Sequence, residues 1–403
     1  MIRVVAGKVS AQGKMEIVAI AEFASPKFDL QDANCTSEFA TAIRSCIEEA
    51  SAIVGLRITS AQVNIADQYL AATTVNSAII KRPDPECPIS QSELDLLLHA
   101  TMKTQVPGLH PIHVSPHDYS VDEFDDVRNP LGMTGETISA TYTLLTVTYN
   151  YMKSLTSITR KAGVQIKGLI PSTVAGFEAC VGKVERERGA VLVDIGSKHS
   201  NLAVVDRGHI TYSTGLPLAG DHFTNDLKIG LGVPRSAAEE LKIIHGTAVV
   251  EGVTAQDFID SSVLAAKLNK NRVSRLTMNT LLRDRALELL ALIMKAIYRS
   301  GRKTLPTGGL ILTGGGSKLS GLPHIASSYL SCPVRVAAPM DILDLPNALR
   351  DPQYPVSIGL LLRGIKNPKQ AFPKNGLLPQ LKPSRLPQWA SKFSYRRIEE
   401  AKV

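Results

Sequence analysis

The sequence contains no long apolar run. Across its 403 residues, no stretch approaches the ~18 to 20 consecutive apolar residues that a membrane-spanning helix requires. The opening residues Met1–Val5 lack the apolar core of a secretory signal. Cysteine is scarce, with five scattered residues and no C-x-x-C spacing. These absences argue against a membrane-spanning helix, a disulfide framework or a zinc site, and they favour free thiols in a reducing cytoplasm.

The body of the chain, residues 1–359, also has no net formal charge. Residues 360–403 contain ten Lys and Arg against two Glu, which accounts for the whole formal charge of +8. A basic body would indicate nucleic-acid binding, so its neutrality argues against that function. A basic tail instead favours a membrane surface or an acidic partner. The remaining composition, 44% hydrophobic and 20% charged, is that of a globular protein long enough for two or three domains.

Strands and helices alternate along the chain, which predicts an α/β fold. Apolar residues at 39, 43, 46, 47 and 50 fall on one face of a helix that Gly55 ends. A second long helix has apolar positions from 282 to 297, and beyond Gly364 five prolines predict a linker. The predicted strands are Arg3–Val9, Glu16–Glu22, Gln62–Ala66, Val191–Val193, Leu202–Val205 and Leu310–Leu312, with a strand, a helix (Glu93–Thr104) and two further strands between 67 and 148.

Two motifs have the composition of phosphate-binding turns. Residues 191–204 predict a strand, a tight turn at Gly196 and a second strand, with Asp194 at a strand end where it can order a magnesium-bound water. Residues 310–319 predict a buried strand followed by Gly314, Gly315 and Gly316. Each motif alone fits a β-hairpin or a tight strand-to-helix turn equally well.

A third motif comprises Gly220-Asp221-His222-Phe223-Thr224-Asn225-Asp226, followed by Glu239 and Lys242. Glu239 and Lys242 are three residues apart, so they share one helix face and can contact a ribose or an adenine edge. Charge spacing alone favours a solvated surface pair at these positions.

The order of these motifs resembles the nucleotide cleft of the actin, Hsp70 and sugar-kinase superfamily, and more narrowly the FtsA family of bacterial division proteins. Further segments that resemble FtsA are His113-Val114-Ser115-Pro116 with Tyr119, Asn129-Pro130-Leu131-Gly132-Met133, Glu185-Arg186-Glu187-Arg188-Gly189 and Val356-Ser357-Ile358-Gly359-Leu360. The resemblance covers residues 2–364 and implies an actin-like (ribonuclease H-like) two-lobed α/β fold. It also implies an inserted α+β subdomain, called 1C or SHS2, and a flexible basic tail.

The resemblance implies the following division of the chain: 1–67 and 149–189 as lobe 1 (1A), 68–148 as 1C, 190–252 and 306–364 as lobe 2 (2A), 253–305 as 2B, 365–385 as a linker and 386–403 as an amphipathic tail. It implies ATP with Mg²⁺ as ligand, no catalytic residue, and no metal ligand other than Asp194 acting through water. The implied nucleotide-binding residues are Asp194, Gly196, Ser197, Lys198, Gly220, Asn225, Asp226, Glu239, Lys242, Gly314, Gly315 and Gly316.

Departures from the family pattern bear on ATP. Family members carry a first phosphate loop, Asp-Ile-Gly-Thr, just before the strand that here starts at Arg3. We expect either a start further upstream or the loss of half the phosphate clamp and a shortened central strand. Where relatives have Gly-Gly-Gly-Thr, this sequence has Gly196-Ser197-Lys198-His199, and Asn201 replaces an Asp. Lys198 and His199 obstruct the phosphate site, or Lys198 supplies charge to it. The hypothesis is weakened ATP binding with adenine contacts kept.

The resemblance also implies partners. The 2B region receives the FtsZ C-terminal peptide in the family, and the exposed candidates are Arg272, Arg275, Arg283 and Arg285; ordinary solvated charges are the alternative. In the tail, an apolar stripe flanked by basic residues is suited to a lipid interface, unless the tail is disordered. The membrane candidates are Leu386, Trp389, Phe393, Lys392, Arg396 and Arg397.

The predicted function is therefore a scaffold on the cytoplasmic face of the bacterial inner membrane, at the division site. It tethers FtsZ filaments, recruits other division proteins and self-associates into filaments, without binding nucleic acid. The alternatives are an actin-like pilus-assembly protein, or an active ATPase or kinase, for which the cleft offers no substrate base.

Overall fold

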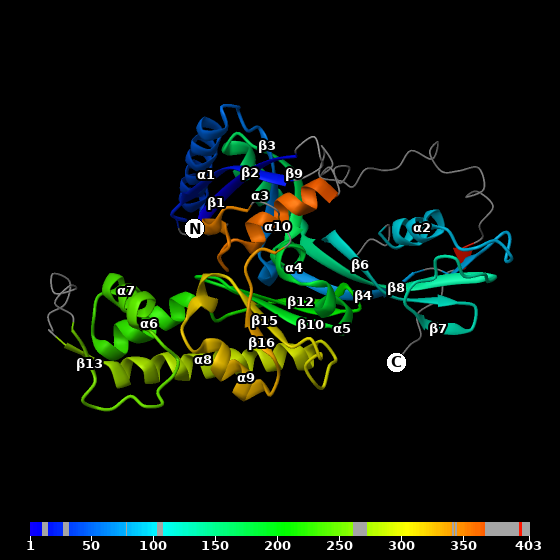
Figure 1. Ribbon diagram of the computed structural model, residues 1–403. Coiled ribbons are helices and arrows are strands. Elements are labelled where there is room, and N and C mark those ends of the chain that lie inside the picture. Colours follow the sequence, from blue (N-terminus) through cyan, green and yellow to red (C-terminus); the bar gives the residue numbers. More distant parts are fainter. Residues whose placement is uncertain are drawn as a thin grey trace.

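The computed structural model describes residues 1–9, 15–26, 32–77, 79–102, 108–260, 272–340, 342, 345–366 and 395–396. Its chain forms two lobes, one above the other in Figure 1, with a smaller subdomain beside them. The N-terminus lies at the junction between the two lobes (Figure 1).

The second lobe is built on a five-stranded sheet of order β12-β11-β10-β15-β16. β10, β11 and β12 form an antiparallel meander, and β15 and β16 continue the sheet parallel to β10. β10 and β11 are buried on both faces, as expected for apolar runs in the centre of a sheet. Three predicted strands of this lobe are confirmed with wider bounds: β10 Ala190–Ile195, β11 Ser200–Asp206 and β15 Leu310–Thr313. The sheet also contains two strands that were not predicted, β12 His209–Leu216 and β16 Val334–Val336.

Helices cover both faces of this sheet. Val191 and Val193 of β10 point into a core with the long α8, while Ala190 and Leu192 point into a core with α4. Ser274 caps α8 by accepting a hydrogen bond from Thr277 N. The helices of the first core are α6 (Gly220–Leu231), α7 (Arg235–His245), α8 (Arg275–Arg299) and α9 (Leu322–Leu330); on the other face lie α4 (Ser172–Cys180) and the short α5 (Lys183–Arg188). The strands β13 (Phe258–Asp260) and β14 (Arg272–Ser274) pair with each other before α8.

The described residues of the first lobe form two two-stranded sheets. β1 and β2 form an antiparallel hairpin, and β3 and β9 form a parallel pair. Helix α1 packs on the hairpin and begins at Asp32, which accepts hydrogen bonds from the first-turn amides; it ends at Gly55, whose φ of 73° suits glycine. The bounds are β1 Ile2–Val9, β2 Met15–Phe23, α1 Ala33–Val54, β3 Ser60–Ile65, α3 Tyr149–Lys161 and β9 Gln165–Pro171.

An α+β subdomain is inserted between β3 and α3. It carries a sheet of order β17-β5-β8-β6-β7, with β4 also pairing with β8, and α2 packs over it. Thr143 Oγ1 donates to Thr211 O of lobe 2, and Arg207 pairs with Asp118, so the subdomain docks on the second lobe. The bounds are η1 Asp67–Tyr69, β4 Leu70–Asn76, β5 Ile79–Lys81, α2 Gln91–Met102, β6 Leu109–Val121, β7 Phe124–Val127 and β8 Thr137–Thr148.

The helices α10 (Pro355–Lys366) and α4 lie where the two lobes meet. They cross so closely that a Cβ at Gly359 would collide with Ala175 O. The short 3-10 turns η3 (Gly315–Lys318) and η4 (Asn347–Leu349) precede α10 in the sequence. The two-residue β17 (Tyr395–Arg396) pairs with β5 of the inserted subdomain. No helix in the described part of the chain is both long and apolar enough to cross a bilayer.

Three details differ from the sequence prediction. The insertion contains β5 and β7 in addition to the three predicted strands. β7 forms because the chain turns back tightly after β6 at Asp122, whose φ is 53°. The predicted linker begins later, since residues 365–366 still belong to α10. For the first lobe we expected either a start further upstream or a shortened central strand, and the residues described there include no strand that joins β1 to β3.

Candidate functional site

The candidate cleft starts where two parallel strands end side by side. Asp194 of β10 is in register with Thr313 of β15, so Gly314 follows directly beside Asp194. Gly314 has a φ of 82°, and a Cβ there would collide with Asp194 Oδ1 and Ile195 O. Glycine is therefore required at this position for both backbone and steric reasons. The expected proximity of Asp194 and Gly314 is confirmed.

The turn after β10 meets the N-terminus of α6. Gly196 N donates to His199 O at 3.1 Å, which closes the turn. Gly220 N donates to Gly196 O at 2.9 Å, and Asp221 N donates to Ser197 O at 2.7 Å. Ser197 Oγ also donates to Asp221 Oδ1 at 2.6 Å. Three backbone amides of the expected phosphate-binding surface are thus hydrogen-bonded within the protein.

Asp221 places a carboxylate at this helix N-terminus. Burial opposes its charge, but the hydrogen bond from Ser197 and the ion pair with Arg235, at 2.8 Å, lower the pKa of Asp221 below its ordinary value. A negative group near helix N–H dipoles is favourable. The side chains of Lys198 and His199 are exposed in the adjacent turn.

Asn201 connects the cleft to the opposite lobe. Its Nδ2 donates to Asp194 Oδ2 at 3.2 Å, and its Oδ1 accepts a hydrogen bond from Asp67 N at 3.0 Å. Burial raises the pKa of Asp194, while the Asn201 hydrogen bond and the positive charge of Arg3 act in the opposite direction. The amide can serve both partners because it carries a donor and an acceptor, which a carboxylate does not.

Asp67 lies at the centre of the contact between the lobes. Its carboxylate accepts hydrogen bonds from Ser213 Oγ of lobe 2 and from the hydroxyl and backbone amide of Thr173. Burial raises the pKa of Asp67 to about 6, although these hydrogen bonds lower it. A Cβ at Gly215 would collide with the backbone of Gln68, so η1 packs directly on β12.

Lobe 1 reaches the cleft through Arg3. The Arg3 guanidinium pairs with Glu22 at 2.5 Å, donates to Gln353 O and lies 4.2 Å from the centre of the Tyr354 ring. The neighbouring Pro352 O accepts a hydrogen bond from Gly314 N at 2.7 Å. Arg3 therefore holds the segment that covers the last glycine motif.

The Met1 amine lies near the same region. Its pKa is lowered by burial first and then by the positive charges of Lys198 and Arg3. Positive charge from Arg3 and Lys198 is therefore concentrated where the first lobe meets the turn after β10.

The predicted pair on α7 lies against α6. Lys242 Nζ donates to Glu239 Oε2 and to Thr224 Oγ1, each at 2.8 Å, and to Gly220 O at 3.2 Å. Thr224 Oγ1 also donates to Glu239. This polar cluster is half-buried and shares Gly220 with the turn after β10. It is not the fully solvated pair that spacing alone favoured.

Other predicted residues occupy different surroundings. Asp226 accepts hydrogen bonds from Arg285 Nε at 2.5 Å and Nη2 at 2.8 Å, so its carboxylate is held by α8. Asn225 is exposed on α6. A Cβ on Gly315 would meet open space, whereas one on Gly316 would collide with Ile195.

The arginine set is less exposed than predicted. Arg272 is exposed, but Arg275, Arg283 and Arg285 are half-buried. Arg285 also pairs with Glu288 at 2.5 Å. The prediction that all four arginines are exposed is therefore wrong for three of them, because α8 directs the side chains of Arg275, Arg283 and Arg285 along the packed surface of lobe 2. In the tail, only the backbone of Arg396 is described, and Leu386, Trp389, Lys392, Phe393 and Arg397 lie outside the described residues.

Comparison with known proteins identifies the family. The family model "Cell division protein FtsA" matches residues 191–359, and the model "SHS2 domain inserted in FTSA" matches residues 71–146. FtsA of Pseudomonas aeruginosa is 29% identical over 361 residues, covering 89% of this chain and 86% of that protein. FtsA of Escherichia coli K12 is 25% identical over 366 residues, covering 89% and 86%. The chain belongs to the FtsA family.

The two family matches cover different parts of the structure. The FtsA match spans β10 to α10, which includes every cleft residue except those of lobe 1, and the SHS2 match lies within β4 to β8. A solved "PilM-PilN type IV pilus biogenesis complex" shares the fold with a TM-score of 0.56 at 18% identity, covering 90% of this chain and 94% of that one. The protein is therefore an actin-like cell-division protein with an inserted SHS2 subdomain.

Sequence reasoning missed the contact between the lobes. Asp67, Thr173 and Ser213 come from η1, α4 and β12, and no spacing in the sequence connects them. Their only signal in the sequence is a polar residue within a largely apolar element, as at Thr173 in the first turn of α4. Arg3 was read as an ordinary strand residue.

Proposed function

We propose that this FtsA-family chain is a scaffold that tethers FtsZ filaments to the cytoplasmic face of the inner membrane at the division site. In this proposal it self-associates into filaments and recruits other division proteins. The observation that carries it is family membership across both the lobe-2 cleft and the SHS2 insertion. An actin-like body with a partner-binding region and a basic amphipathic tail supplies the two attachments that a tether needs.

The proposal includes ATP with Mg²⁺ as a weakly bound ligand. Two features of the turn after β10 support weak binding of the phosphates. The backbone amides of Gly196, Gly220 and Asp221 are already hydrogen-bonded within the protein. The Asp221 carboxylate also repels a second anion. Asn201 donates to the Asp194 carboxylate, which otherwise would order water around a cation. These contacts compete with a triphosphate and its metal.

The adenine side retains a binding surface. Glu239, Lys242 and Thr224 form a half-buried polar cluster next to the α6 N-terminus, and Gly315 borders open space. In the proposal these residues would hold the nucleoside, and bound ATP would favour a particular arrangement of the lobes and thus filament formation. Turnover is weak or absent in this proposal, because none of the cleft residues described above is placed as a general base.

The FtsZ peptide is proposed to bind the surface of β14 and α8. Arg272, Arg275 and Arg283 remain the candidates, since a cation can pair with the acidic peptide. Arg285 is excluded from this set because it is held by Asp226 and Glu288. We expect an Arg272→Ala/Arg275→Ala/Arg283→Ala variant to bind a fluorescent FtsZ C-terminal peptide about tenfold more weakly, the loss of ~1.4 kcal/mol.

The matched control for that variant is Lys295→Ala/Arg299→Ala. It removes two exposed cations from the far end of the same helix. Fluorescence anisotropy of the peptide at one salt concentration would compare the three proteins. Unchanged affinity of the arginine variant, or an equal loss in the control, would refute this surface.

The membrane attachment is proposed to use the tail residues Leu386, Trp389 and Phe393, with Lys392, Arg396 and Arg397 near the headgroups. Each basic residue near an anionic surface contributes on the order of 1 kcal/mol. We expect the chain to sediment with vesicles that contain anionic lipid, and Trp389→Ala/Phe393→Ala to remain in the supernatant. Sedimentation of that variant at the level of the original chain would argue against the anchor.

A further inference from the structure

The inserted subdomain and the tail carry opposite charge. Between residues 68 and 148 the sequence has ten Asp and Glu against four Lys and Arg, which leaves a net charge of −6. Residues 367–396 contain six Lys and Arg and no Asp or Glu. Opposite charges attract over distances of up to about 8 Å at physiological ionic strength. The attraction therefore acts wherever the two parts lie close together.

The tail and the subdomain are in contact through their backbones. β17, which consists of Tyr395 and Arg396, pairs with β5 and extends the sheet of the subdomain by one strand. The pairing is antiparallel, with Tyr395 opposite Ile80 and Arg396 opposite Ile79. In Figure 1, β17 is the short red arrow beside the cyan strands of the subdomain. Main-chain pairing along the edge of a sheet is a common way to hold an extended segment.

Acidic side chains gather at one end of β5. Lys81, the last residue of this strand, forms an exposed ion pair with Glu136 at 2.5 Å. Asp122 accepts a hydrogen bond from the backbone amide of Glu136 at 3.1 Å. Asp84 and Glu86 are exposed in the loop that directly follows the strand. Four carboxylates thus lie around this end of β5, with Lys81 among them.

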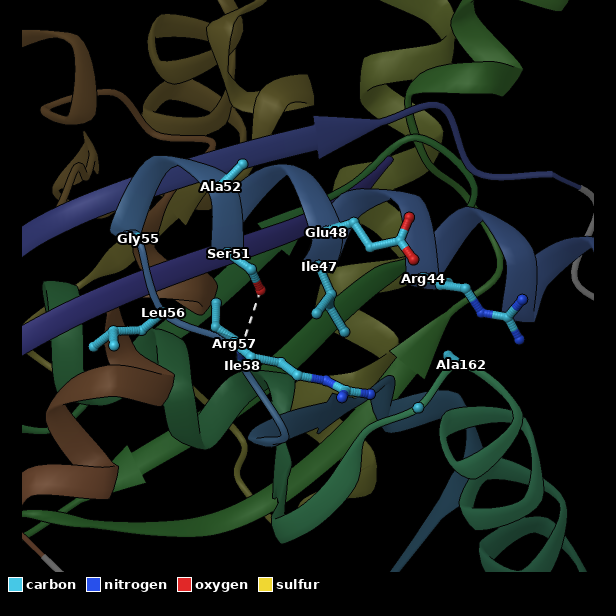
Figure 2. A pocket seen from close by; sticks show the side chains of 11 residues that line it. Arg44, Ile47, Glu48, Ser51, Ala52, Gly55, Leu56, Arg57, Ile58 and Ala162 are labelled. Atoms are coloured by element: carbon cyan, nitrogen blue, oxygen red, sulfur yellow. Dashed lines mark hydrogen bonds between the residues drawn. The ribbon is translucent and has the colours of Figure 1, made fainter.

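A cavity in lobe 1 offers a surface of different charge. It has a volume of about 580 Å³ and lies between α1 and residues 56–58 and 162–163. Figure 2 shows the charged side chains among its lining residues, Arg44, Glu48 and Arg57. Two cations against one carboxylate do not attract a basic tail. The outer edge of β5, with its acidic end, is the surface that suits the tail.

The strand conformation of the tail is incompatible with a membrane helix. In an α-helix the amide of Arg396 would bond to the carbonyl of Lys392. The same helix would bring Leu386, Trp389 and Phe393 onto one face. In β17 the backbone of Arg396 is instead extended and paired with β5. One tail therefore cannot hold both arrangements at the same time.

We propose that the outer edge of β5 is a docking site for the tail of the same chain, and that docking competes with membrane binding. This inference rests on the proposed function of the tail as a membrane anchor. The antiparallel direction puts the amino end of β17 toward Lys81. Lys392, three residues before Tyr395, then reaches the acidic end of β5. The 28 residues between α10 and β17 can extend over about 90 Å, so the tail reaches β5 of its own chain.

Anionic lipid and the acidic subdomain are then rivals for one basic segment. Away from an anionic membrane the tail stays on β5, and its helix does not form. A tail that is docked about nine-tenths of the time binds vesicles about tenfold more weakly than a free tail, because only the undocked fraction is competent. Docking thus restricts attachment to membranes that bind the tail strongly.

A disulfide across the strand pair tests docking on the full-length chain. Ile79→Cys/Arg396→Cys places two thiols at directly opposite positions, where Cα atoms about 4.5 to 5.5 Å apart suit a disulfide. We expect mild oxidation to join most of the protein within single chains. Mass spectrometry of the joined peptides distinguishes this bond from bonds to native thiols such as Cys87.

The matched control is Phe124→Cys/Arg396→Cys. Phe124 is exposed on β7, at the opposite edge of the same sheet. We expect this control to crosslink at least about tenfold less. Equal yields in the two proteins, including no crosslink in either, would overturn the proposal. So would crosslinks that form only between two chains.

Vesicle binding of the same two proteins tests the competition. Sedimentation with vesicles of phosphatidylcholine and phosphatidylglycerol is measured before and after the disulfide is reduced. We expect oxidised Ile79→Cys/Arg396→Cys to bind about tenfold more weakly and reduction to restore binding, while the Phe124 control binds equally in both states. Equal binding of the oxidised and reduced forms would overturn the competition. If even the original chain does not bind vesicles, the membrane anchor and the competition both fail, and the crosslink alone decides whether the tail docks on β5.

Discussion

Replacing Asn201 with Asp tests the connection between the cleft and the contact of the two lobes. Asn201 is buried and hydrogen-bonds to Asp194 Oδ2 at 3.2 Å and to Asp67 N at 3.0 Å. Asn201→Asp keeps the oxygen that accepts the hydrogen bond from Asp67 N. It replaces the amide nitrogen that donates to Asp194 with a second carboxylate oxygen. Two carboxylates would then face each other within hydrogen-bond distance.

The cost of that arrangement follows from the distance. Two unit charges 3.2 Å apart repel by about 5 kcal/mol at an effective dielectric constant of ~20. Sharing one proton avoids the repulsion but requires a carboxyl group to stay protonated, which costs ~1.4 kcal/mol for each pH unit above its ordinary pKa. We expect Asn201→Asp to lower the free energy of unfolding by about 3 to 5 kcal/mol at pH 7.5.

The loss must depend on pH with a definite sign. A carboxyl pair raises the folded-state pKa of one member above its unfolded value, so the folded protein binds a proton that the unfolded chain releases. The deficit of the variant is therefore small near pH 5 and grows as the pH rises toward 8. Asn201→Ala loses the hydrogen bonds without adding charge, so its deficit is smaller, about 1 to 3 kcal/mol. Because the Asn201 hydrogen bond lowers the pKa of Asp194, this deficit should also grow with pH, but less steeply than that of Asn201→Asp.

Circular dichroism at 222 nm during chemical denaturation measures these differences at pH 5, 6.5 and 8. The Ala variant serves as the control for packing and hydrogen bonding. An Asn201→Asp protein that is as stable as the original chain would refute the reasoning. So would a loss of stability that is the same at all three pH values. In that case Asp194 and residue 201 do not share an enclosed environment.

Three further predictions concern single residues. Arg285→Ala should lower the free energy of unfolding by about 1 to 3 kcal/mol, because it leaves the half-buried Asp226 carboxylate without its partner; thermal denaturation measures this, and an unchanged midpoint would contradict the packing of α6 on α8. Burial raises the pKa of Asp67 to about 6 from its ordinary 3.8, so the folded state retains the proton. The original chain should therefore lose on the order of 3 kcal/mol relative to Asp67→Asn between pH 4 and 7, and parallel stability curves of the two proteins would rule this out. Lys242→Met should lower stability by about 1 to 2 kcal/mol, because Thr224 loses a donor; a neutral effect would show that the α6–α7 cluster is not structural.

Much of the fold could be predicted because local patterns and packing agree. The apolar runs of β10, β11 and β15 are buried on both faces, as continuous apolar strands in a covered sheet must be. Gly55 ends α1 because it adopts a positive φ, which the sequence indicated. The order of the glycine motifs also predicted that Asp194 and Gly314 would be neighbours.

What could not be predicted depends on contacts between distant segments. Glu239 and Lys242 are three residues apart, but their half-buried state depends on Thr224 of another helix. Arg285 and Arg272 are both arginines near α8, and only the position of Asp226 makes one an internal ion pair and leaves the other exposed. In the described part of lobe 1, β1 pairs only with β2 and β3 only with β9, which no local pattern in these strands indicates.

The most direct test of the scaffold is recruitment of fluorescent FtsZ filaments to anionic vesicles by this chain, measured with and without Mg-ATP. The account predicts recruitment under both conditions, loss of recruitment in the Trp389→Ala/Phe393→Ala variant, and negligible phosphate release. Absence of recruitment, or recruitment that requires ATP together with sustained turnover, would contradict it.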